Sequence, residues 1–97
     1  MKYGKVIGTI WATRKDDRLR GLKLLVLQPL NMYDDSAEES PLIAADIIGA
    51  GEGEKVIYVG GSSARGAAGS IETPVDATVI GIVDDLEIAV SDKKAGA

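Results

Sequence analysis

The 97-residue sequence contains no cysteine, no histidine and no phenylalanine. Without cysteine, the chain has no disulfide, no thiolate metal ligand and no thiol nucleophile. Without histidine, it lacks the side chain that most often acts as a general base or metal ligand. These absences exclude the commonest catalytic and metal-binding arrangements. We therefore expect no cofactor, no metal site and no enzymatic activity.

Long apolar runs and excess positive charge are also missing. No segment approaches the roughly 20 apolar residues of a membrane-spanning helix, and the net charge of −4 does not favour nucleic acid or an anionic membrane as the main partner. The first residues lead directly into a strand pattern, without the apolar core of a signal peptide. The expectation is a cytoplasmic protein with neither a membrane nor a nucleic acid as partner.

What the chain does have is aliphatic surface. Hydrophobic residues make up 45% of the sequence and aromatic residues only 4%. A domain of this length buries only about 60–65% of the surface that its unfolded chain exposes. Small domains compensate with disulfides, metals or oligomerisation. Because cysteine and histidine are absent, the composition leaves oligomerisation. It therefore predicts an oligomer.

Strand patterns separated by turn signals run along the whole chain. Alternating and β-branched residues predict strands at 2–12, 22–30, 42–48, 55–60 and 77–88, with an acidic loop at 31–41. Ser62 is expected to cap one helical turn through Ala68, and Gly81 marks a bend or a close approach within its strand. The fold class predicted is mainly all-β: a five-stranded OB-like barrel with one short helix at 1–88, followed by a flexible tail at 89–97.

Two segments resemble functional motifs. Gly49, Gly51 and Gly53 have the spacing of a phosphate-binding loop, but a strand pattern follows them, and acidic residues stand among them. We interpret them as a tight turn with positive φ angles. Ser62 and Ser63 have no histidine to activate them, which leaves a helix cap as the structural interpretation and a small ligand-binding protein or enzyme as an open alternative.

Charge is divided unevenly along the chain. Residues 1–23 carry seven basic and two acidic residues, whereas residues 24–97 carry four and thirteen. One interpretation is a nucleic-acid surface, with Trp11 and a tyrosine as stacking platforms for a single strand. The other is a pair of complementary surfaces that meet between subunits. The basic side chains of this hairpin are Arg14, Lys15, Arg18, Arg20 and Lys23.

Four blocks of sequence resemble, in order, the bacterial microcompartment vertex proteins of the EutN/CcmL family. Departures from the family pattern fall at 31–41, at 66–69 and in the tail. The blocks are TRK…LxGxKLLV…QPL at 13–30, AD…GAGxGExV at 45–56, GSSAR at 61–65 and PVDA…GIVD at 74–84.

The resemblance implies an OB-like barrel that assembles as a homopentamer. Such rings cap the vertices of a polyhedral, carboxysome-like shell built mostly of hexameric shell proteins, and they have no catalytic role. The resemblance also implies that the matched segments lie near subunit contacts. The residues concerned are Gly49, Gly51, Gly53, Ser62, Ser63, Ala64, Arg65 and Asp76. Asp76 and Asp84 are possible carboxylate partners for Arg65.

Overall fold

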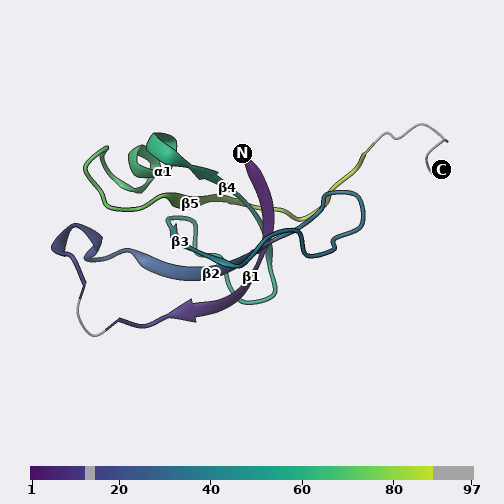
Figure 1. The fold of residues 1–97 in the computed structure, drawn as a ribbon, viewed down its shortest axis with the longest axis horizontal. Coiled ribbons are helices and arrows are strands. Elements are labelled where there is room, and N and C mark those ends of the chain that lie inside the picture. The colour runs from purple at the N-terminus through teal and green to yellow at the C-terminus, as the bar shows by residue number, and fades with distance from the viewer. Residues whose placement is uncertain (13–14, 89–97) are drawn as a thin grey trace.

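The computed structural model describes residues 1–12 and 15–88 of the chain. Its strands close into a barrel in the order β1-β2-β3-β5-β4, which confirms the predicted five-stranded barrel (Figure 1). The predicted tail at 89–97 lies outside the described residues. The strands are β1 (Lys2–Ile10), β2 (Lys23–Pro29), β3 (Leu42–Asp46), β4 (Lys55–Gly60) and β5 (Ala77–Ile82).

Two short helices accompany the barrel. The helix α1 (Gly61–Ala68) follows β4 and packs against β4 and β5. A 3-10 turn, η1 (Asp17–Leu19), lies in the connection between β1 and β2. Figure 1 shows this connection at one end of the molecule and the loop after β2 toward the other end. The two loops are therefore well separated on one subunit.

Alternation along the strands builds the core. Val6, Leu25, Leu27, Val56 and Val79 are fully buried inside the barrel. Burying each such side chain contributes about 1.5–3 kcal/mol relative to leaving it in water. A hydrogen bond holds the helix against β5: the buried Thr78 hydroxyl donates to the carbonyl of Ala64 at 2.7 Å.

The outer face of the sheet also carries apolar residues. Val26 of β2 is paired with Gly8 on one side and with Ile43 on the other. The Ile43 side chain is 52% exposed, and Ile7 on β1 is also exposed. The aliphatic surplus of the sequence predicts an oligomer, and the structure leaves these outward side chains uncovered within the subunit.

Strand ends differ from the sequence prediction where tertiary contacts stop. The strand from residue 77 ends at Ile82, because that residue pairs with Val56, and β4 begins only one residue before Val56, at Lys55. Likewise β1 ends at Ile10, opposite Leu24 near the start of β2. The close approach at Gly81 is confirmed, since a Cβ there would lie 3.1 Å from Cγ1 of Ile57.

The predicted cap of the helix is wrong. The N-cap residue is Gly60, and no side chain bonds to the first turn. The helix starts at Gly61, one residue before Ser62, so the Ser62 hydroxyl stands within the helix, on its exposed first turn. The first residue of the helix, Gly61, makes this transition possible, because it adopts a φ of +62°, which glycine reaches at little cost.

Candidate functional site

The glycine-rich turn between β3 and β4 is built around one carboxylate. Asp46, only 7% exposed, accepts hydrogen bonds from the backbone amides of Ile48, Gly49 and Ala50 at 2.9–3.2 Å. Gly49 and Gly53 have φ angles of +95° and +88°. The interpretation as a tight turn is therefore confirmed at these two positions.

The middle glycine of the turn has a different role. Gly51 has no positive φ, and its amide donates to the Glu54 carboxylate at 2.7 Å. Glu52 is exposed beside it. An exposed carboxylate and an amide already bonded to another carboxylate make this turn unsuited to phosphate.

The basic hairpin is less cationic than its sequence suggests. Arg18 forms a bidentate pair with Asp16 at 2.8–2.9 Å and donates to the carbonyl of Glu72. Arg20 pairs with Asp17. The hydrogen bonds from Arg18 hold the pKa of the Asp16 carboxyl well below its ordinary value. Local aspartates thus neutralise two of the arginines.

Of the other basic residues of the hairpin, the structure shows one hydrogen-bonded to the glycine-rich turn and one exposed to solvent. The Lys23 ammonium donates to the carbonyl of Ala50 at 3.0 Å, which brings the hairpin and the glycine turn together as a single surface. Lys15 is exposed. Arg14 lies outside the described residues.

Residues of the α1 segment divide between the core and the surface. The Ala64 side chain is fully buried, so it packs α1 onto its own barrel and presents no side chain to another subunit. Ser62 and Ser63 are exposed, and Arg65 is half-buried. Among residues 1–12 and 15–88, Arg65 forms no ion pair with Asp76 or Asp84.

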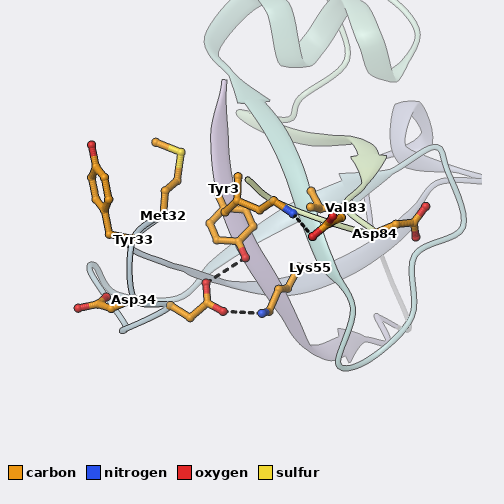
Figure 2. Close-up of a pocket in the computed structure, with 10 residues that line it drawn as sticks. Tyr3, Met32, Tyr33, Asp34, Lys55, Val83 and Asp84 are labelled. Carbon is orange, nitrogen blue, oxygen red and sulfur yellow. Dashed lines mark hydrogen bonds and ion pairs between the residues drawn. The ribbon is translucent and has the colours of Figure 1, made fainter. Parts of the chain in front are cut away.

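The acidic loop at 31–41 is tied to the barrel through Asp35. Its carboxylate accepts a hydrogen bond from the Tyr3 hydroxyl at 3.0 Å and forms an ion pair with Lys55. Figure 2 shows Tyr3 and Lys55 reaching toward the loop from neighbouring strands. These contacts lower the pKa of Asp35 and raise that of Lys55. Burial, together with Asp35, raises the pKa of the Tyr3 hydroxyl.

Sequence reasoning missed this anchor. Asp35 adopts a φ of +60°, a conformation that aspartate tolerates better than most residues. An aspartate in a polar loop hints at such a backbone conformation. Nothing local in the sequence points to Lys55, which is 20 residues away.

An apolar groove of about 590 Å³ lies where β3, β4 and β5 meet the start of β1. Tyr58 is nearly fully buried there, and its hydroxyl has no hydrogen-bond partner among the described residues. Burial first, and then the negative charge of Glu39, raise the pKa of Tyr58. The groove is lined chiefly by Lys2, Pro41, Leu42, Ile43, Tyr58 and Asp76, and we call it the Ile43 groove.

Trp11 is the most exposed large apolar side chain of the described chain, at 90%. A single-strand binder would stack several aromatic rings along one basic groove. Tyr3 and Tyr58 are buried, and Tyr33 stands on the acidic loop. Trp11 therefore has no aromatic companion on the basic hairpin, which disfavours the nucleic-acid interpretation.

Two further kinds of feature are missing from the described residues. Within the described ranges, no three acidic side chains cluster in a way that would hold a metal ion. Within the same ranges, no helix is long and apolar enough to cross a membrane.

Comparison with known proteins gives a consistent result. Residues 1–84 match the family model described as "Ethanolamine utilisation protein EutN/carboxysome". The chain is 41% identical over 90 residues to the carboxysome shell vertex protein CcmL of Gloeobacter violaceus, covering 91% of this chain and 87% of that protein. It is 44% identical over 89 residues to the microcompartment shell vertex protein GrpN of Rhodospirillum rubrum, covering 90% and 97%.

Solved structures agree with the sequence matches. An ethanolamine utilization protein, EutN, superposes with a TM-score of 0.86 at 41% identity and covers 91% of both chains. The pentameric GrpN shell protein of Rhodospirillum rubrum superposes with a TM-score of 0.80 at 43% identity, covering 91% of this chain and all of that one.

Proposed function

The chain belongs to the EutN/CcmL family, and from this premise we propose that five copies form a ring that caps the vertices of a bacterial microcompartment shell. The observation that carries the proposal is the match to a pentameric shell protein along that protein's whole length. The protein is a structural component and not an enzyme.

The physical argument for a vertex role is geometric. A flat layer of six-fold tiles cannot close into a polyhedron, whereas a five-fold unit in place of a six-fold one forces curvature. A cyclic ring needs a head-to-tail interface, in which one patch meets a different patch on the next copy. The basic hairpin and the acidic loop at 31–41 are unlike patches of this kind, and the uncovered Ile7 and Ile43 supply apolar contact.

The finer parts of the proposal concern partners and residues. We propose that the ring contacts hexameric shell proteins at its rim, in the shell of a cytoplasmic compartment. Within the ring, the residues of the matched blocks that are exposed or half-buried are proposed to lie at subunit contacts: Gly49, Gly51, Gly53, Ser62, Ser63, Arg65 and Asp76. Arg65 supports this role, because its guanidinium has no carboxylate partner in the described part of its own subunit.

Native mass spectrometry of the purified chain at micromolar concentration tests the ring. A species of five times the chain mass is the expected result, and a stable monomer would contradict the proposal. Co-expression with hexameric shell proteins tests the vertex role, since closed polyhedra are expected with this chain and open or elongated assemblies without it.

Arg65→Glu examines the proposed contact. It removes a planar donor and adds negative charge beside an acidic surface, and removing one partner of a buried interface pair costs about 3–5 kcal/mol. The ring is expected to dissociate while the barrel stays folded. Arg65→Lys is the matched control, because it keeps the charge. An unchanged ring in Arg65→Glu would remove Arg65 from the interface.

A further inference from the structure

One side chain and one groove of this subunit stand out as uncovered. Trp11 directly follows β1, and almost its whole indole is in water. A tryptophan buries about 150–250 Å² when covered, and tryptophans of this kind dominate interface energetics. The Ile43 groove offers an apolar surface of matching chemistry, with Ile43 half-exposed and the Tyr58 ring beside it.

The two features do not meet within one subunit, because Trp11 stays 90% exposed there. Lys2 lines the groove, and Trp11 lies nine residues further along the same chain, one residue beyond the end of β1. A straight strand of this length spans roughly 30 Å. The Ile43 end of the groove lies nearer, two strands from Gly8, and the indole is still uncovered. A contact between Trp11 and the groove therefore joins two copies. It is head-to-tail, because each copy offers its indole to one neighbour and its groove to the other.

Charge favours the same pairing. Residues 13–23 carry five basic and two acidic residues, a net charge of +3. The loop at 31–41 carries four acidic residues and no basic one, a net charge of −4. Pro41, the last residue of that loop, lines the groove. Opposite potentials would steer the hairpin of one copy to the groove of the next and set its register.

We propose that Trp11 of each subunit inserts into the Ile43 groove of the neighbouring copy and is the main apolar anchor between subunits of the ring. This inference rests on the proposed ring and names the contact that closes it.

The absence of cysteine permits a direct test by cross-linking. Ala12 and Pro41 are exposed and flank the indole and the groove, so an Ala12→Cys/Pro41→Cys variant places thiols on both sides of the proposed contact and leaves Trp11 and Ile43 in place. Mild oxidation is expected to give a ladder of covalent species that ends at the pentamer on a non-reducing gel. Either single-cysteine variant stops at the dimer. A native pentamer without this ladder would overturn the proposal.

Truncation of the anchor gives a second test. Trp11→Ala is expected to raise the concentration needed for half-assembly by at least about thirtyfold, the equivalent of a hot-spot truncation. Ile71→Ala is the matched control, because it removes another exposed apolar side chain, which lines neither the groove nor the acidic loop. Equal effects of the two variants, or no effect of Trp11→Ala on the ring, would overturn the proposal.

Trp11 is the sole tryptophan of the chain, so its fluorescence separates the possible outcomes. Emission is expected to shift to the blue as the monomer is concentrated into rings. A pentamer with solvent-exposed emission overturns the Trp11 contact and leaves the proposed function standing. A chain that stays monomeric overturns the proposed function itself. If Trp11→Ala rings form normally but fail to enter shells, Trp11 contacts a shell tile and not the neighbouring subunit. That outcome also overturns the inference.

Discussion

The turn at 47–54 and the loop at 31–41 are each held by a single aspartate, and the two solutions differ. Asp46 binds backbone amides two to four residues away and is shielded from solvent. Asp35 binds two side chains, from strands that are far from it in the sequence, and its carboxylate is exposed. The first arrangement is local, so it forms with the chain segment itself. The second exists only once the barrel has brought Tyr3 and Lys55 together.

The energetic consequence follows from the surroundings of each carboxylate. Amides left without Asp46 would lose partners in a site with little access to water, which is costly. The Asp35 contacts are screened by water and salt, and exposed ion pairs contribute little. The stability of the turn should therefore be insensitive to pH and salt but sensitive to substitution of its aspartate. The loop should be sensitive to pH and salt, whereas substitution of its aspartate should cost little.

The largest effect is expected at Asp46. Asp46→Ala leaves the amides of Ile48, Gly49 and Ala50 without their acceptor and should lower the free energy of unfolding by about 3 kcal/mol. Chemical denaturation measures it. Asp46→Asn is the matched control, because it keeps one acceptor oxygen and should cost less. Equal stability of Asp46→Ala and the parent would mean that the turn does not depend on this carboxylate.

An intermediate effect is expected at Gly53. Its φ of +88° is unfavourable for a residue with a Cβ, although a methyl group would meet no atom within 4 Å. Gly53→Ala should therefore cost about 1 kcal/mol through backbone strain alone. Gly66→Ala, in α1 and equally unobstructed, should instead stabilise by up to about 1 kcal/mol. Thermal unfolding compares the two, and effects of the same sign would contradict the strain argument.

The smallest effect is expected at Asp35, and it depends on pH. Lys55 and Tyr3 lower the pKa of Asp35, so its contribution is complete above the ordinary carboxyl pKa of about 4 and is lost as the pH falls through the lowered value. Asp35→Asn should leave stability at neutral pH nearly unchanged and make the loss of stability below about pH 4 less steep. Thermal unfolding of both chains against pH measures this.

Salt provides the control for that experiment. Raising the ionic strength should weaken the parent's loop contact and leave Asp35→Asn unaffected. An identical pH dependence in both chains would mean that the Lys55–Asp35 pair contributes nothing to the fold.

How far the sequence prediction reached depends on how local each signal was. The strand Lys55–Gly60 was predicted with its observed bounds, because β-branched alternation there ends at glycine signals. The third strand was predicted to reach residue 48 but ends at Asp46. The apolar pair Ile47-Ile48 looks like a continuing strand, and only the hydrogen bonds to the Asp46 carboxylate show that the chain turns there.

The candidate site divides in the same way. The glycine turn and the OB-like barrel were predicted correctly, whereas the burial of Ala64 and the pairing of Arg18 and Arg20 with their neighbouring aspartates were not. The Ile43 groove was also missed. A groove is formed by strands from four parts of the chain, so no short stretch of sequence carries its signal.

The sequence by itself determined the class of protein. Alternation, turn glycines and the absence of histidine and cysteine are local or compositional properties, and they suffice for a barrel without the usual catalytic groups. The tertiary structure alone decided which apolar side chains are covered and which charges are paired. Both depend on distances between residues far apart in the chain, and closing the barrel sets those distances: it buried Val6 and Leu27 and left Trp11 in water just beyond the end of β1.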